Sequence, residues 1–491
     1  MQQLLSARQR TILIGILAFT LCVRLFTLGA YPLADTTEGR YAEIARKMAE
    51  TGNWVTPQED YGVPFWAKPP LSTWLTAISF KAFGVNEFTA RLSSLLLVLA
   101  ICWLTYYLSL RQRGRDHALM ALFIAATTGL LFVTAGAVMT DASLGLSTTL
   151  CMVAFWKAYS GKGRAWGYLF FVGLAAGLLA KGAAAFVLTV FPLAIWTVWK
   201  RQWRTVWDRL PWVSGMLVTL TLAVPWYVLA ELRTPGFLDY FFIGEHFNRF
   251  TVTGWRGDKY GTAHDAARGM IWLYWLLADL PWSLVFVGAL VRKALRRKSG
   301  EAVLPTDDWT AYIISWAASP MLFFTLAGNI MLTYVLSGLP AFGILAAEVW
   351  RSGSGREDAP EEQRGRGVLW PAMGLVIPLI VLIMMSTIGP ELVSRKSQKA
   401  VVTKYLSLRP NDASRLVYLN KRPHSAEFYT RGKAEQAKPE QLERYFENAS
   451  QDFFVLRDID LEGVPVAAME RLEPVWQYQN LNLMRERTDQ P

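Results

Sequence analysis

Long apolar blocks alternate with short polar stretches from residue 11 to residue 389. Most blocks are about 18–22 residues long, the length that crosses the hydrocarbon core of a bilayer as one helix. Trp and Tyr gather at the ends of the blocks, as in the aromatic belts of membrane proteins. The pattern predicts about eleven transmembrane helices, at residues 11–30, 88–110, 117–138, 140–159, 165–181, 183–200, 211–231, 269–291, 309–327, 330–350 and 368–389.

Lys and Arg residues mark every second loop of this pattern. They precede the first block and join blocks two and three, four and five, six and seven, eight and nine, and ten and eleven. Short loops rich in Lys and Arg stay in the cytoplasm. We therefore expect a multi-pass protein of the bacterial inner membrane, with a cytoplasmic N-terminus and with the residues after the last block in the periplasm.

The composition supports a membrane protein. Hydrophobic residues make up 53% of the 491 residues and charged residues 18%, whereas a soluble chain carries about 25% charged residues. The net charge of +11 resides largely in the loops described above, so it indicates membrane topology and no nucleic-acid partner. Cys22, Cys102 and Cys151 all lie inside apolar blocks and form neither a disulfide framework nor a metal-ligand spacing.

Two long loops interrupt the helical pattern on the predicted outer side, at residues 31–87 and 232–268. Within the first loop, apolar and charged residues alternate at helical spacing over Glu38–Thr51. This spacing predicts an amphipathic helix that lies along the membrane surface. The segment Pro235–Phe250 of the second loop has the same character.

The pattern changes again after residue 389, where short apolar runs alternate with charged, proline-containing stretches. Such runs are typical of a small α/β domain outside the membrane. The predicted fold is thus an α-helical polytopic membrane domain, residues 1–389, followed by a small extramembrane α/β domain in the periplasm, residues 390–491.

Residues suited to chemistry gather on the predicted outer side. Each alone has a structural interpretation, such as a lipid-headgroup contact, a helix cap or an interfacial side chain. Their convergence favours a site, because ionisable residues at membrane depth are costly. They come from the two long loops and from outer helix ends, and they are Asp35, Glu38, Arg40, Tyr41, Lys68, Asp141, Lys181, Glu245, His246, Arg249 and Tyr334.

Acids and bases at a water–lipid boundary suit the transfer of a group from a lipid phosphate carrier. A leaving phosphate needs Lys or Arg to neutralise its developing charge. An attacking hydroxyl needs a carboxylate to orient it and to accept its proton. Carboxylates also stabilise the oxocarbenium-like transition state of a transferred sugar. The sequence contains no nucleotide-binding motif, so the lipid-linked donor would store the energy of the reaction.

Three motifs carry a family resemblance: Thr37-Glu-Gly-Arg-Tyr-Ala-Glu-Ile-Ala-Arg46, Lys68-Pro69, and Glu245-His-Phe-Asn-Arg-Phe250. They resemble the C-type (GT-C) membrane glycosyltransferases, specifically the glycosyltransferase family 39-like group of aminoarabinose transferases and protein O-mannosyltransferases. The resemblance covers most of the membrane region. It implies a polyprenyl-phosphate sugar donor, an inverting transfer and an active site in an outer cavity.

The resemblance also assigns roles to positions of this sequence. Arg40 and Lys68 match family residues around the carrier phosphate, and Asp141 matches the essential acid at the start of a helix. A stretch of the family that contributes to the phosphate and metal region matches Glu245, His246 and Arg249. The resemblance alone implies this role for the three positions.

The sequence departs from the aminoarabinose enzymes at several of these motifs. Thr37 stands where they have the first acid of an Asp-Glu pair, and Asp35 is the substitute that we expect. Ala67 stands where they have a glutamate, and Ile330-Met331-Leu332 replaces a Lys-Leu-Pro. The membrane region is also shorter than theirs. The sugar therefore stays open, and no cofactor is predicted beyond a candidate divalent metal with His246 as its ligand.

We therefore predict a glycosyltransferase that moves a hexosyl or pentosyl group from a polyprenyl phosphate to a lipid or glycan acceptor, such as lipid A or lipopolysaccharide. Predicted roles are catalysis for Asp35, Glu38 and Asp141, donor-phosphate binding for Arg40, Tyr41, Lys68, Arg249 and Tyr334, and other site contacts for Lys181 and Glu245. One alternative is a protein O-mannosyltransferase, which would be expected to have an acidic pair in the first loop. A flippase or transporter, the other alternative, favours midplane charges and an internal repeat.

Overall fold

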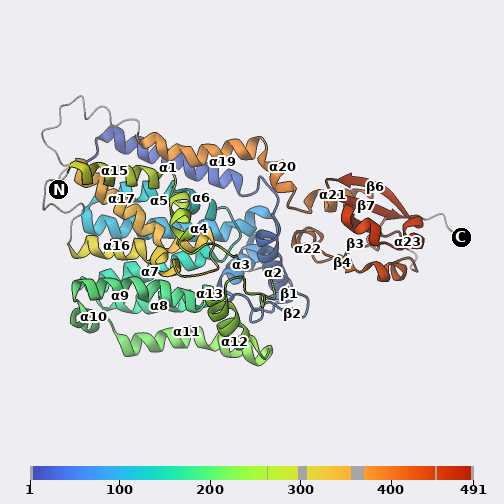
Figure 1. Ribbon diagram of the computed structural model, residues 1–491, viewed down its shortest axis with the longest axis horizontal. Coiled ribbons are helices and arrows are strands. Elements are labelled where there is room, and N and C mark those ends of the chain that lie inside the picture. Colours follow the sequence, from blue (N-terminus) through green and yellow to red (C-terminus); the bar gives the residue numbers. More distant parts are fainter. Residues whose placement is uncertain (1–3, 262–263, 297–306, 355–369, 448–449, 488–491) are drawn as a thin grey trace.

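The computed structural model describes residues 4–261, 264–296, 307–354, 370–447 and 450–487. The chain forms an elongated helical bundle with a smaller α/β unit at one end (Figure 1). Most long helices run along the long axis, and the C-terminal strands lie beyond the end of the bundle that carries α2 and α3. The predicted architecture, a polytopic helical domain followed by a small α/β domain, is confirmed.

Each of the predicted apolar blocks contains helical residues. Among the described residues, five helices are long and apolar enough to cross a membrane: α1 (Ala7–Thr27), α4 (Glu87–Arg113), α9 (Ala183–Lys200), α11 (Trp212–Arg233) and the segment Leu332–Ser352. Other predicted blocks form α7 (Asp141–Tyr159), α8 (Arg164–Lys181) and α16 (Asp308–Phe324). In α7, hydroxyls such as those of Ser147 and Thr149 bond to carbonyls four residues earlier, which lets polar residues occupy a buried helix.

Two blocks that were predicted as single helices are broken. The block at 117–138 forms α5 (Arg115–Ala126) and α6 (Gly129–Thr134), and the block at 269–291 forms α14 (Met270–Ala278) and α15 (Trp282–Arg296), bent by 106°. The breaks contact each other, because the amide of Gly129 donates to the carbonyl of Leu280 at 2.9 Å. Pro281 has no amide hydrogen to continue α14. Irregular backbone at membrane depth is tolerated where protein groups satisfy it.

The tenth and eleventh blocks begin in a tighter helical form. A 3-10 segment, η2 (Leu332–Gly338), leads into α17 (Leu339–Ser354), and η4 (Trp370–Leu375) leads into α19 (Val376–Ser386). The loop that contains α10 (Trp203–Arg209), which the sequence predicts to be cytoplasmic, joins α9 to α11.

The first long loop holds more structure than its pattern predicted. It contains α2 (Thr37–Thr51), the short antiparallel strands β1 (Gln58–Asp60) and β2 (Val63–Pro64), and α3 (Leu71–Phe83), which we did not predict. The bounds of α2 agree with the prediction, but its placement does not. Lys47 is fully buried and Arg46 nearly so, because α22 (His424–Thr430) of the C-terminal domain covers this helix. It therefore does not lie on a lipid surface.

The second long loop forms α12 (Phe237–Asp239), the π-helical segment η1 (Tyr240–Asn248) and α13 (Arg249–Thr251). The helical character predicted for residues 235–250 is thus confirmed. A π-helix is rare and occurs mostly at functional sites.

The C-terminal domain is built on a five-stranded sheet. Its strands are β3 (Leu416–Leu419), β4 (Ala434–Ala437), β5 (Phe453–Arg457), β6 (Leu472–Tyr478) and β7 (Leu481–Glu486), in the order β4-β3-β5-β7-β6. β3 pairs in parallel with both β4 and β5, and the remaining pairs are antiparallel. β3 and the first four residues of β5 are apolar because helices cover both faces of the sheet, namely α21 (Lys399–Leu408) and α22 on one side and α23 (Val466–Glu470) on the other.

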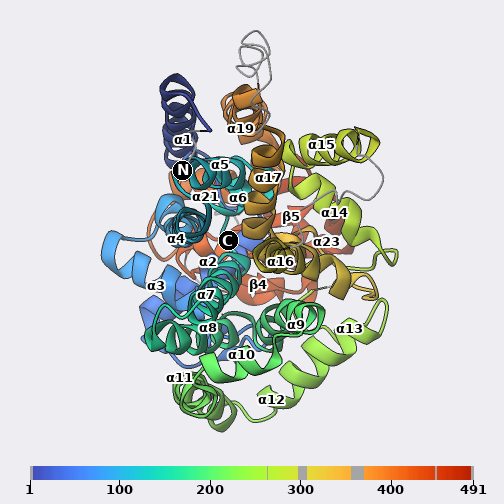
Figure 2. The same cartoon turned by 90° about the vertical axis from the view of Figure 1, so that its left-hand side faces the viewer.

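The core of the bundle lies around α7, α16 and α17, which occupy the middle of the end view (Figure 2). Helices α1, α11 and α15 lie at its rim and expose apolar side chains, as lipid-facing helices do. Large aromatic side chains, including Trp196, Trp309 and Trp316, fill the centre. This core holds α7 and α8 side by side, which positions the residues at their outer ends.

Candidate active site

Asp141 and Lys181 form an ion pair at the outer ends of two adjacent helices. Asp141 is in the first turn of α7, and Lys181 is the last residue of α8, where Gly182 at φ +64° turns the chain sharply into α9. Lys181 Nζ lies 2.6 Å from Asp141 Oδ1 and 5.2 Å from the ring centre of Tyr334. Thr140 is the cap residue of α7, so the carboxylate of Asp141 is free to face Lys181.

A second ionic cluster joins the two long outer loops. Lys68 Nζ lies 2.9 Å from Glu245 Oε2, and Arg249 Nη1 lies 3.1 Å from the same oxygen. Arg249 Nη1 also lies 3.3 Å from Asp258. Burial tends to raise the pKa of Glu245, but Lys68 and Arg249 outweigh it and hold that pKa below its usual range. Glu245 therefore keeps two cations in place at one spot.

His246 connects these two clusters. Its Nδ1 lies 2.7 Å from the carbonyl of Phe241 and its Nε2 lies 3.2 Å from the carbonyl of Lys181. Burial is the largest influence on the pKa of His246 and lowers it below its usual value. With both nitrogens directed at carbonyl oxygens, His246 does not fit a metal ligand. The part of the chain that the structure describes contains no group of three His, Cys, Asp or Glu residues that could hold a metal.

Arg40 and Tyr41 come from α2 and face the same region of the two loops. Arg40 donates through Nη1 to the carbonyl of Tyr260 in the second loop. Its Nε is buried without a hydrogen-bond partner among the described residues, as is the Nε of Arg249. Buried donors without partners are costly, so these guanidinium groups are suited to receive an anion.

Asp35 and Glu38, the two acids predicted in the first loop, are engaged elsewhere. Asp35 accepts hydrogen bonds from the amide and the hydroxyl of Ser425, and burial raises its pKa. Glu38 forms a two-pronged ion pair with Arg91 of α4, at 2.9 and 2.8 Å. Their catalytic role stays a prediction. Of the three carboxylates predicted to be catalytic, Asp141 is the one that forms an ion pair with a predicted site cation, Lys181.

Sequence reasoning missed several residues of this region. Arg91 is fully buried and also donates to the carbonyls of Leu28, Tyr31 and Pro32, so it holds the start of the first loop. A charged residue inside an apolar block was the signal that could have identified it. Tyr260 and Asp258 had no such signal, since they lie in a polar loop.

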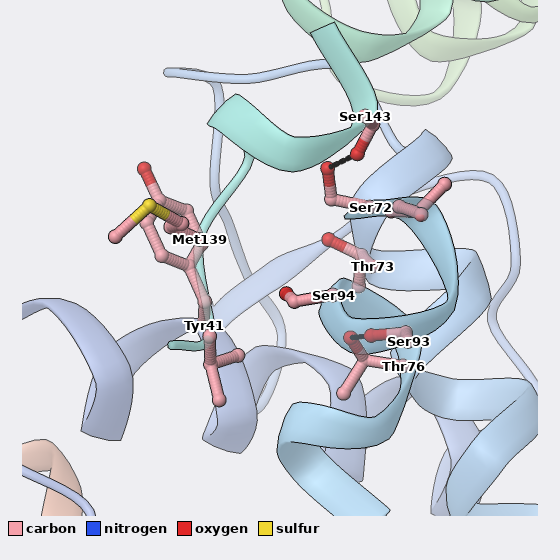
Figure 3. Close-up of a pocket in the computed structure, with 10 residues that line it drawn as sticks. Tyr41, Ser72, Thr73, Thr76, Ser93, Ser94, Met139 and Ser143 are labelled. Carbon is pink, nitrogen blue, oxygen red and sulfur yellow. Dashed lines mark hydrogen bonds between the residues drawn. The ribbon is translucent and has the colours of Figure 1, made fainter. Parts of the chain in front are cut away.

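An uncharged pocket lies between α3, α4 and α7 (Figure 3). Hydroxyl side chains from α3, α4 and α7 line it together with Tyr41 and Met139. Ser72 hydrogen-bonds to Ser143, and Thr76 to Ser93 at 3.0 Å. Its volume of about 10 Å³ holds about one water molecule.

The chain is similar in sequence to two groups of known membrane transferases. Residues 11–241 match the family model of dolichyl-phosphate-mannose-protein mannosyltransferases. The chain is 30% identical over 391 residues to the undecaprenyl phosphate-alpha-4-amino-4-deoxy-L-arabinose arabinosyl transferase of Enterobacter sp. strain 638, covering 77% of this chain and 65% of that protein. The protein of the same name from Aeromonas hydrophila is 32% identical over 340 residues, which cover 67% and 57% of the two chains. The chain thus spans less than two thirds of these curated relatives.

The fold is similar to that of ArnT from Cupriavidus metallidurans, which was crystallised with undecaprenyl phosphate. The TM-score is 0.80 at 18% identity, over 97% of this chain and 98% of that one. In sequence and in fold, this polytopic membrane protein is similar to the C-type (GT-C) glycosyltransferase group that contains the aminoarabinose transferases and the protein O-mannosyltransferases.

Proposed function

We propose that this chain transfers a sugar from a polyprenyl-phosphate donor to a lipid or glycan acceptor on the outer face of the bacterial inner membrane. The observation that carries the proposal is the contact between the Asp141–Lys181 pair and the Lys68–Glu245–Arg249 cluster through His246. This arrangement places one carboxylate beside several cations at the outer end of the bundle.

The residues divide the reaction between them. Arg40, Lys68 and Arg249 bind the phosphate and neutralise the charge that develops as it leaves. Tyr334 lies under Lys181, and both close the side of the site next to Asp141. The carboxylate of Asp141 accepts the proton of the acceptor hydroxyl while the hydroxyl oxygen of the acceptor bonds to the anomeric carbon. The bond between that carbon and the phosphate oxygen breaks, and polyprenyl phosphate is released.

The topology proposed from the loop charges fits this chemistry. The N-terminus lies in the cytoplasm, and residues 1–389 form the catalytic membrane domain. Residues 390–491 form a periplasmic domain above the site. The curated relatives named for an arabinosyl transfer support a pentose as the sugar. The departures at Thr37 and Ala67 concern the motifs of those relatives, so the acceptor and the amino group of the sugar are the points to test.

Mass spectrometry of lipid A and of lipid-linked sugars tests this function. We would compare cells that express the wild-type chain, cells that express Asp141→Asn, and cells without it. Loss of a pentose- or hexose-sized mass from a glycolipid, with the lipid-linked sugar accumulating in both deficient strains, is the expected result. A sugar lost from proteins alone would favour the O-mannosyltransferase alternative, for which the family model match is the supporting observation. An unchanged set of glycoconjugates would contradict both.

A further inference from the structure

The C-terminal domain contacts the membrane domain through α22, and it does so on the helix that carries Arg40. Figure 1 shows α22 beside α2 at the outer end of the bundle. Phe428 of α22 is buried among Leu33, Ala42 and Met48, and its ring lies 6.0 Å from that of Phe80. An apolar side chain from the C-terminal domain thus completes the small core beneath α2.

Buried charges lock the same contact. Lys47 of α2 is fully buried, and its Nζ lies 3.2 Å from both carboxylate oxygens of Glu427. Arg422 bridges in the other direction, with Nη2 at 2.6 Å from Glu427 and at 2.6 Å from Asp60 of β1. Because breaking such pairs leaves an uncompensated buried charge, α22 is held in one orientation on the first loop.

The C-terminal domain also meets the membrane domain at Gly39, one residue before Arg40. The amide of Ser425 donates to Asp35 Oδ1 at 2.9 Å, and its hydroxyl donates to Oδ2. A Cβ at Gly39 would lie 2.6 Å from Asp35 Oδ1 and 3.0 Å from the amide nitrogen of Ser425. The absence of a side chain at Gly39 therefore lets Asp35 and Ser425 pack against the backbone of α2 one residue before Arg40.

We propose, on the basis of the function proposed above, that Ser425 of the C-terminal domain is a positioning residue for donor binding. It acts through Asp35 and Gly39 to set the place of the Arg40 guanidinium, which then receives the phosphate of the polyprenyl donor. The C-terminal domain is thereby part of the donor site, although it contributes no group that touches the reacting atoms.

Binding of undecaprenyl phosphate to the purified full-length chain, titrated by native mass spectrometry, tests the proposal without turnover. Ser425→Ala and Gly39→Ala should each weaken binding about fivefold, while Arg40→Gln should weaken it further. The double variant Ser425→Ala/Arg40→Gln should bind no more weakly than Arg40→Gln alone, because Ser425 acts only through Arg40. Arg485→Gln, on β7 where it pairs with Glu473, is the control and should bind like the wild type.

Thermal melting of each variant in detergent shows whether it is folded. Folded Ser425→Ala and Gly39→Ala variants with wild-type affinity would overturn the positioning role. So would a double variant in which the two losses multiply, because that result would make Ser425 independent of Arg40. A wild-type chain that fails to bind undecaprenyl phosphate would instead contradict the proposed function itself, which separates the two failures.

Discussion

Charged side chains are buried at both ends of the helical bundle. At the end that the loop charges assign to the cytoplasm, Glu348 accepts hydrogen bonds from Arg113 Nε at 2.5 Å, Trp309 Nε1 at 2.9 Å and Arg351 Nη2 at 2.8 Å. Both carboxylate oxygens are used, and the side chain is fully buried. At the outer end, Arg40 and Arg249 each keep a buried Nε without a partner among the described residues.

This difference in hydrogen bonding distinguishes an ionic cluster that holds helices together, the inner clamp at Glu348, from one that can bind a ligand. At Glu348, both carboxylate oxygens accept hydrogen bonds from side chains of α4, α16 and α17, which holds these helices together. A cluster with spare donors is held at some cost and gains from a bound anion. The supports also differ, because regular helices, α4, α16 and α17, carry most of the inner cluster, whereas loops and a π-helical segment carry much of the outer one.

Glu348→Gln should break the inner clamp and cause the largest loss of stability. Removing one partner of a buried ion pair costs about 3–5 kcal/mol, so the melting temperature in detergent should fall strongly. Transfer per folded molecule should stay at the wild-type value, since the residue is far from the outer site. A variant that keeps its stability but loses activity would reverse the two assignments.

Lys68→Met and Asp141→Asn, at the outer end, should lower transfer and leave stability unchanged. Each removes a group proposed to stabilise the transition state, so transfer should fall by about 10²–10³-fold. Membrane insertion and the elution profile of the purified protein should be unchanged. Radiolabelled or mass-detected sugar transfer to lipid A is the measurement, and normal turnover by either variant would show that the site lies elsewhere.

Arg249→Lys compared with Arg351→Lys sharpens the contrast, because each keeps its charge and loses the guanidinium fork. At the outer end the lost donor should weaken undecaprenyl phosphate binding about tenfold, which corresponds to roughly 1.4 kcal/mol. At the inner end the same exchange should leave binding unchanged. Equal effects of the two exchanges would show that charge alone, and not the free Nε, attracts the phosphate.

The smallest expected effect is a pH dependence at the contact between the C-terminal domain and α2. Burial, reinforced by Arg40 and Lys47, lowers the pKa of His424 from 6.5 to about 3. The unfolded state therefore binds a proton that the folded state does not, so the stability from neutral His424 is complete above pH 6.5 and is lost as the pH falls toward 3.

Glu427 acts in the same window with the opposite sign, because burial raises its pKa from 4.5 to about 7. The informative quantity is thus the difference between the wild type and His424→Gln. The melting temperature of the wild type relative to this variant should fall by several degrees between pH 7 and pH 5. A constant difference across this range would contradict a neutral His424.

The sequence by itself determined most of the helical segments, the side of the membrane proposed for each loop, and several residues of the candidate site, including Lys68, Asp141, Lys181 and Glu245. These features are local, since block length and apolar content decide whether a segment crosses a bilayer and loop charge decides its orientation. The breaks at Gly129 and Pro281 were harder to foresee, because each depends on a partner segment that satisfies the exposed backbone.

Only the tertiary structure decided which residues meet. Asp141 pairs with Lys181, Lys68 with Glu245 across 177 positions, and Asp35 with Ser425 across 390. Glu38, which its motif made a catalytic candidate, pairs instead with Arg91. No local pattern encodes these choices, because a buried charge takes whichever partner the packing of distant helices brings within reach.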